Sequence, residues 1–68
     1  MNYKVEYEYS DMIIYARVDD DNVIRKTCND EDKDFQKWLF ENQDNLPTDI
    51  QAKVDSGDLI ITDNGGAQ

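Results

Sequence analysis

The segment NDEDKDFQKWLFEN, residues 29–42, decides the fold class, because its apolar residues follow a spacing that the chain before it does not show. Phe35, Trp38 and Leu39 stand at positions i, i+3 and i+4, which places all three on one side of an α-helix. Phe40 lies about 140° from Phe35 around the same helix, at roughly 100° per residue, and falls outside this stripe. The segment therefore predicts an amphipathic helix with Phe40 near the edge of its buried face.

Acidic residues gather at the start of this predicted helix: Asp30, Glu31, Asp32 and Asp34. Negative charge is favourable at the positive end of a helix dipole, and Asn29 or Asp30 is the expected N-cap. Together with Glu41, three of these acids match carboxylate positions of an EF-hand calcium loop, but Phe35 stands where that loop needs glycine. We therefore expect a helix start here, without a metal site or a cofactor.

The residues before position 29 predict three β-strands joined by polar turns at 10–11 and 19–22. In YKVEYEY, residues 3–9, apolar or aromatic residues alternate with charged ones, which is the period of a strand with one buried face. MIIYARV, residues 12–18, is apolar on both faces, as a central strand is. VIRKTC, residues 23–28, predicts a third, more exposed strand. This order predicts an antiparallel meander.

The chain after residue 42 predicts a second helix and a last strand. The helix begins at Pro47, carries Ile50 and Val54 one turn apart, and ends at Gly57. DLIIT, residues 58–62, is apolar and β-branched, which favours a fourth strand.

These elements predict a single acidic α+β domain over residues 1–63, followed by a flexible C-terminal tail at residues 64–68. The predicted fold is an antiparallel sheet of three to four strands with one long and one short helix packed on one face. A chain of 68 residues buries only about 60% of the surface that it exposes when unfolded. The core is therefore thin, and most large apolar residues are needed in it.

The first strand carries a row of large residues on one face: Tyr3, Val5, Tyr7 and Tyr9. This row has the most apolar area of the meander, which favours packing under Phe35, Trp38 and Leu39, with the phenol oxygens at the edge. The alternative is a binding role, because tyrosine is frequent at binding hot spots. Tyr9, at the strand end, is the first candidate for exposure.

The residues that enzymes use for nucleophilic catalysis are scarce in this chain. It has no histidine, a single cysteine and no glycine loop followed by lysine for phosphate binding. Cys28 is expected to be a small buried hydrophobe. No catalytic residue is therefore predicted, and the protein is expected not to be an enzyme. No signal peptide or apolar run of membrane-spanning length is visible, so no membrane role is expected.

The net charge of −9 is unevenly distributed along the chain. Residues 1–28 hold six acids and four bases, whereas residues 29–68 hold ten acids and three bases. Such a field repels nucleic acid and attracts basic protein surfaces. The acids of the second part either form a solubilising face or imitate the phosphates of DNA: Asp30, Glu31, Asp32, Asp34, Glu41, Asp44, Asp49, Asp55 and Asp58.

Residues 23–42, VIRKTCNDEDKDFQKWLFEN, resemble small accessory proteins of tailed bacteriophages, in which a V-I-R strand and a polar loop precede a helix of the form D-Y-Q-x-aromatic-L. The matching positions are Val23, Ile24, Arg25, Asp34, Phe35, Gln36, Trp38 and Leu39. Glu41 stands where that pattern has tryptophan, and its glycine-asparagine turn is absent. The resemblance implies a virion, tail or assembly-associated protein without catalysis, located in the host cytoplasm or the virion. It transfers no functional residue.

The sequence thus predicts a non-enzymatic protein-binding domain that contributes its first sheet and helix to a phage assembly. The predicted contact residues are Tyr9, Tyr15 and Phe40, as the aromatics least secure in the core, with Asp30, Glu31 and Asp32 setting the electrostatics. The alternative is an acidic DNA mimic that inhibits a basic host nucleic-acid-binding protein. A homodimer through an exposed sheet edge is also open, because a thin core gains from association.

Overall fold

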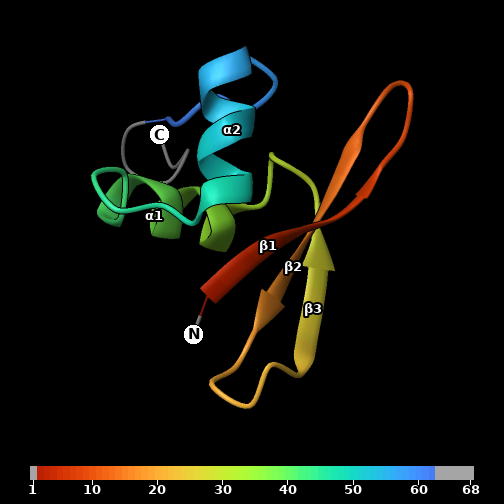
Figure 1. Ribbon diagram of the computed structural model, residues 1–68, viewed down its shortest axis with the longest axis vertical. Coiled ribbons are helices and arrows are strands. Elements are labelled where there is room, and N and C mark those ends of the chain that lie inside the picture. Colours follow the sequence, from red (N-terminus) through yellow and green to blue (C-terminus); the bar gives the residue numbers. More distant parts are fainter. Residues whose placement is uncertain (1, 63–68) are drawn as a thin grey trace.

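The computed structural model describes residues 2–62, in which a β-meander is followed by two helices (Figure 1). The strands β1 (Asn2–Glu8), β2 (Ile13–Val18) and β3 (Ile24–Cys28) form one antiparallel sheet in the order β1-β2-β3. This confirms the predicted meander, with the segment that is apolar on both faces in its centre. The tail predicted at 64–68 lies outside the described residues.

The helices are α1 (Lys33–Glu41) and α2 (Thr48–Ser56), and each has nine residues. The prediction of one long and one short helix is therefore wrong. Pro47 directly precedes α2, where its fixed backbone suits a helix start. Gly57 ends α2 as predicted, since its φ of 88° is a conformation that other residues rarely adopt.

The first helix is shorter than expected because residues 29–32 form a turn before it. The Asp32 N–H donates to the Asn29 carbonyl across this turn. Asp32 is then the N-cap, and its side chain accepts a hydrogen bond from the Phe35 N–H at 3.0 Å. The expected cap at Asn29 or Asp30 is thus wrong by two or three residues.

The fourth strand predicted at residues 58–62 is not formed, and within residues 2–62 the sheet has three strands. The buried amide of Gln36 on α1 satisfies the backbone of this segment instead. Its Nε2 donates to the Ile60 carbonyl at 2.9 Å, and its Oε1 accepts from the Thr62 N–H at 3.0 Å. Leu59 is fully buried, so the segment closes the core as an irregular strap along α1.

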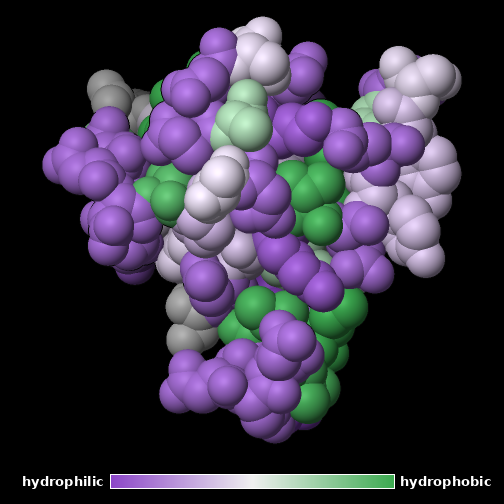
Figure 2. All heavy atoms as spheres, in the orientation of Figure 1, coloured by the Kyte–Doolittle hydropathy of each residue, from purple (hydrophilic) through white to green (hydrophobic). Residues whose placement is uncertain are grey.

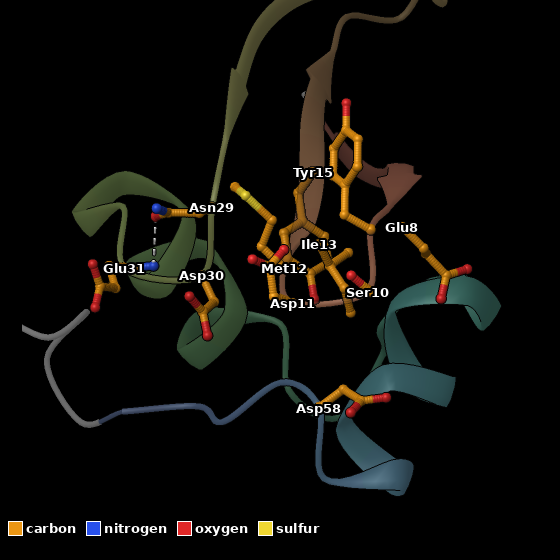
Figure 3. Close-up of a pocket in the computed structure, with 11 residues that line it drawn as sticks. Glu8, Ser10, Asp11, Met12, Ile13, Tyr15, Asn29, Asp30, Glu31 and Asp58 are labelled. Carbon is orange, nitrogen blue, oxygen red and sulfur yellow. Dashed lines mark hydrogen bonds between the residues drawn. The ribbon is translucent and has the colours of Figure 1, made fainter.

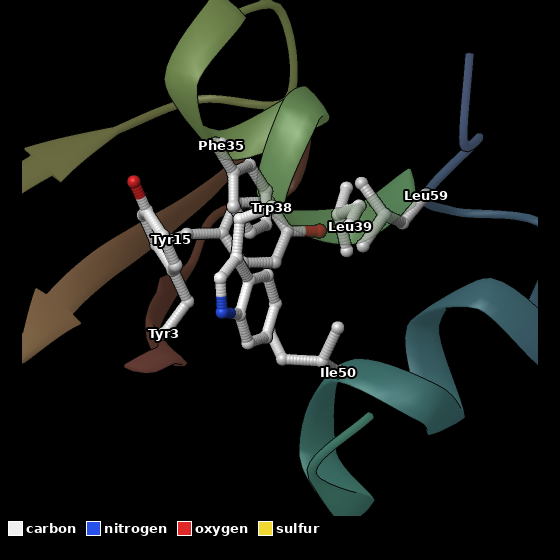
Figure 4. Close-up of a cluster of buried hydrophobic side chains, with 7 residues drawn as sticks. All are labelled: Tyr3, Tyr15, Phe35, Trp38, Leu39, Ile50 and Leu59. Atoms are coloured by element: carbon white, nitrogen blue, oxygen red, sulfur yellow. The ribbon is translucent and has the colours of Figure 1, made fainter. Parts of the chain in front are cut away.

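The core is a single cluster of buried side chains from the sheet, both helices and the strap (Figure 4): Tyr3, Tyr15, Phe35, Trp38, Leu39, Ile50 and Leu59. α1 reaches the sheet through its rings, because the Phe35 ring centroid lies 4.7 Å from that of Tyr3 and 4.6 Å from that of Tyr15. α2 lies along β1, where the carboxylate of Asp49 accepts a hydrogen bond from the Val5 N–H at 2.9 Å.

A β-bulge divides the tyrosine row of β1 into two parts. Val5 pairs with Tyr15 and Tyr7 pairs with Ile14, so Glu6 is an extra residue in the ladder. Directly paired residues share a face of the sheet, and Tyr7 is thereby moved to the face opposite the core. Tyr3 is 1% exposed, but Tyr7 and Tyr9 are 60% and 57% exposed. The predicted packing holds for the start of the row and is wrong for Tyr7.

Candidate functional site

A cleft of about 570 Å³ opens where the tip of the β1–β2 hairpin, the loop before α1 and the chain after α2 come together (Figure 3). Five of its eleven lining residues carry carboxylates: Glu8, Asp11, Asp30, Glu31 and Asp58. The remaining lining residues are Tyr9, Ser10, Met12, Ile13, Tyr15 and Asn29. We call this feature the acidic cleft.

Hydrogen bonds fix each of the three segments that carry the carboxylates. At the hairpin tip, the Tyr9 N–H donates to the Met12 carbonyl at 2.8 Å and closes a tight turn. In the loop before α1, Gln36 Nε2 donates to the Asp30 carbonyl at 2.7 Å. After α2, the hydroxyl of Ser56 lies 2.9 Å from a carboxylate oxygen of Asp58. The same glutamine therefore anchors one wall of the cleft and the strap beside it.

Most of the negative charge in the cleft is uncompensated. Glu8 forms an ion pair with Lys53 of α2. In the part of the chain that the structure describes, no lysine or arginine forms an ion pair with Asp11, Asp30 or Glu31. A cation that entered the cleft would meet several carboxylates that are free to bind it.

The electrostatic effect is visible on Tyr15, which lies at the floor of the cleft. Burial raises the pKa of Tyr15 to about 12, and the negative charges of Asp30, Asp58 and Glu8 add to the rise. All three acids line the cleft. The floor therefore senses a negative potential, and Tyr15 keeps its proton at neutral pH.

Four of the six predicted contact residues line the cleft, namely Tyr9, Tyr15, Asp30 and Glu31. Tyr15 is only 1% exposed, so the expectation that this ring is held loosely is wrong. The reason is its position on the central strand, directly under Phe35.

The two other predicted contact residues lie outside the cleft. Asp32 caps α1 and forms an ion pair with Lys26, with 2.8 Å between the charged atoms. Partial burial would raise the pKa of Asp32, but the hydrogen bonds from Lys26 and from the Phe35 N–H hold it below its usual value. Phe40 is 40% exposed on α1 and stays a predicted contact that no observation tests.

Sequence reasoning did not name Glu8 or Asp11 as binding residues, and it named Asp58 only in the row of acids of the DNA-mimic alternative; these three residues complete the cleft. Glu8 and Asp58 are 50 positions apart, and no local pattern indicates that they meet. Only the path of the strap along α1 brings Asp58 to the hairpin tip, and that path depends on the side chain of Gln36.

A second cavity, of about 340 Å³, lies at the other end of the core and has a balanced charge. Arg17 and Lys37 line it together with Asp34, Glu41, Tyr3 and Trp38. Part of the exposed apolar surface lies away from both cavities. Figure 2 shows it at the lower end of the molecule, near the β2–β3 turn, where Val23 and Ile24 are the exposed apolar residues. The acidic cleft is thus distinct from both features.

Cys28 packs against the core, and its pKa is raised to about 11, first by burial and then by the charge of Asp32. A thiol in this state is a poor nucleophile at neutral pH.

No protein-family model matches the chain, and neither a curated protein nor a solved structure shows significant similarity to it. Within residues 2–62, no three side chains of His, Cys, Asp or Glu lie close enough together to hold a metal ion. Neither α1 nor α2 is long and apolar enough to cross a membrane.

Proposed function

We propose that this protein is a non-enzymatic protein-binding domain whose acidic cleft receives a basic segment of a partner protein. The observation that carries the proposal is the convergence of five carboxylates from three separate segments on one cleft. Tyr9 stands at the rim as an exposed aromatic residue. An acidic concave site with an aromatic rim suits a protein surface rich in lysine or arginine.

The charge distribution of the whole chain supports the same partner class. A net charge of −9 steers basic proteins towards the domain and speeds their association at low salt. A basic host nucleic-acid-binding protein and a basic phage structural protein both fit this description. Salt should weaken the complex, since part of its affinity comes from charge.

The alternative, a mimic of DNA phosphates along the helices, is less well supported by the geometry. Two acids of the predicted row use their carboxylates within the fold, because Asp32 caps α1 and Asp49 accepts a hydrogen bond from Val5. A mimic needs regularly presented charges on the surface. Three of the nine acids in that row, Asp30, Glu31 and Asp58, instead line a concavity.

The proposal is tested by affinity capture of the tagged protein from a bacterial lysate, with and without phage infection, eluted at rising salt. Asp30→Asn combined with Glu31→Gln should abolish capture of basic partners. Asp44→Asn combined with Asp55→Asn removes the same charge outside the cleft and should leave capture nearly intact. Equal loss in both double variants would point to the total charge of the protein and overturn the assignment to the cleft.

A further inference from the structure

The second cavity, at the end of the core away from the acidic cleft, is lined by side chains that donate hydrogen bonds. Arg17 of β2 and Lys37 and Trp38 of α1 reach it beside Tyr3. Tyr3 and Arg17 are directly paired in the β1–β2 ladder, and the Tyr3 ring centroid lies 4.9 Å from that of Trp38. The sheet and the helix therefore hold these groups around one space of about 340 Å³.

The indole N–H of Trp38 has no acceptor, although the residue is only 8% exposed and no hydrogen bond of its side chain is formed within residues 2–62. A buried indole N–H usually has a partner. The buried side-chain atoms that are orphans, meaning that they lack a partner, are the hydroxyls of Tyr3 and Tyr15 and Nε of Arg17. The indole nitrogen is not one of them, so it belongs to the small accessible part of Trp38, at the cavity. Figure 4 shows it on the side of Tyr3, away from Leu39.

The guanidinium group of Arg17 is in a similar state. It forms no hydrogen bond or ion pair with any residue that the structure describes, and of its nitrogens only Nε is a buried orphan. The two terminal nitrogens are therefore accessible at the cavity, while the packed Nε holds the planar group in place. Lys37 is exposed and has no ion pair among the described residues either.

Cations without partners are unexpected in a chain that has sixteen acids and seven bases. Over the described part of the chain, the bases that form no ion pair are Arg17, Lys33 and Lys37. Two of these three line the same cavity, together with the unpartnered indole N–H. This concentration of free donors indicates a ligand that accepts hydrogen bonds and carries negative charge.

The remaining lining residues limit the charge of that ligand. Asp34 and Glu41 also line the cavity, and Asp34 lies 3.7 Å from Lys26. With two acids beside two cations and a net charge of −9 for the whole chain, a phosphate with nearly two charges would be repelled. A carboxylate has one charge and two oxygens in a plane, which match the terminal nitrogens of a guanidinium group.

We infer that the second cavity binds a carboxylate group, held by the terminal nitrogens of Arg17, the indole N–H of Trp38 and the ammonium group of Lys37. Its volume of about 340 Å³ is that of a small-molecule site. The carboxylate belongs either to a small organic anion or to an acidic side chain of a peptide. The site is separate from the acidic cleft and takes a ligand of the opposite charge.

The test follows the indole N–H of Trp38 by NMR, because Trp38 is the single tryptophan of the chain and its resonance is unique. Benzoate is titrated into the isotopically labelled full-length protein at low salt and should shift this resonance to saturation. Benzamide, a neutral molecule of the same shape, and phenyl phosphate should each bind at least about tenfold more weakly. An acetylated and amidated Gly-Ser-Glu-Ser-Gly peptide separates the two sources: saturation by it assigns the site to peptides, and its failure beside bound benzoate assigns the site to small anions.

Variants of the three unpaired bases locate the contact. Arg17→Gln should weaken benzoate binding at least about tenfold, the usual effect of losing hydrogen bonds to a charged group. Lys37→Gln should weaken it about threefold, as expected for an exposed ion pair. Lys33→Gln removes the same charge from α1 outside the cavity and should leave the affinity unchanged. Glu41→Gln removes an acid that competes for the same donors and should strengthen binding about threefold.

Benzamide that binds as tightly as benzoate would overturn the inference, because the cavity would then accept a ring without regard to charge. Equal losses in Lys37→Gln and Lys33→Gln would also overturn it, since they indicate a general effect of charge. This comparison uses exposed residues and stays decisive if Arg17→Gln fails to fold. A Glu41→Gln variant that is less stable and gains no affinity would show that Glu41 is the partner of Arg17, and the inference would be wrong.

Discussion

Tyrosines stand at both ends of the first strand, but they are buried at one end and exposed at the other. At the base of the β1–β2 hairpin, Tyr3 is 1% exposed, with its ring centroid 4.9 Å from that of Trp38. Towards the tip, Tyr7 and Tyr9 are 60% and 57% exposed, and their ring centroids lie 6.2 Å apart. Tyr3 at the base is thus part of the core, whereas Tyr7 and Tyr9 towards the tip are exposed on the surface.

The difference arises from a single residue. With Glu6 extra in the ladder, the alternation of faces is shifted by one position beyond Val5. The base of the hairpin is therefore tied to the core, while the tip projects beside the acidic cleft. A regular strand would direct Tyr3, Val5 and Tyr7 to the same face, so the bulge is what separates the buried from the exposed part of the row.

The largest expected effect is a difference in stability between two variants of β1, each of which loses one tyrosine ring. Tyr3→Ala should cost about 3–5 kcal/mol, because a large aromatic residue leaves a cavity between Phe35 and Trp38. A domain of this size has roughly that much stability in total, so the variant should be largely unfolded. Tyr7→Ala should change the free energy of unfolding by less than about 0.5 kcal/mol. Urea denaturation followed by Trp38 fluorescence compares the two variants, and equal losses would contradict the division of the row.

Single-residue deletions test the bulge itself. Deleting Glu6 should leave every pair of the β1–β2 ladder in place, at a cost below about 1 kcal/mol, because the deleted residue has no partner. Deleting Lys4 should move Tyr3 to the outer face and destabilise the domain almost as much as Tyr3→Ala. Circular dichroism and NMR of both variants distinguish these outcomes. A collapse of the Glu6 deletion would show that the bulge is needed for folding.

Much of this architecture could be predicted from local patterns. The period of two in residues 3–9, the run that is apolar on both faces and the i, i+3, i+4 stripe of α1 predicted the meander and the amphipathic helix correctly. These signals work because burial of one face imposes its own period on the sequence. Gly57 was predictable as a helix end for a similarly local reason.

The remaining features depend on contacts between distant residues. The apolar residues at 58–62 favour a strand. The side-chain amide of Gln36 instead donates a hydrogen bond to the carbonyl of Ile60, 24 positions later, and holds this segment along α1. The bulge leaves no signature in an alternating sequence, so Tyr7 was assigned to the wrong face. For the same reason, three of the five carboxylates in the cleft could be assigned to one site only from the folded structure.

A smaller effect concerns the cap that holds α1 over the base of the hairpin. Asp32→Ala should cost about 1 kcal/mol at neutral pH, because it leaves the Phe35 N–H without its acceptor. Asp34→Ala removes an acid that is 72% exposed in its side chain and should cost little.

Since the pKa of Asp32 is lower in the folded state than its usual value of 3.8, its contribution is complete above that pH and is lost as the pH falls below it. The stability difference between wild type and Asp32→Ala should therefore shrink at acid pH, as measured by denaturation at pH 7 and pH 3. A constant difference would mean that the carboxylate charge is not what stabilises the helix start.

The smallest effect has the opposite sign and concerns the orphan hydroxyls. Replacing Tyr15 with Phe removes a buried group that lacks a partner, so the free energy of unfolding should rise, by no more than about 1 kcal/mol. Tyr3→Phe should do the same at the other end of the core. A loss of stability in either variant would show that its hydroxyl contributes to the folded state and would contradict this prediction. Thermal denaturation of both variants beside the wild-type protein measures the change, and a rise of similar size in the two would show that each hydroxyl is buried at a cost that packing of the ring outweighs.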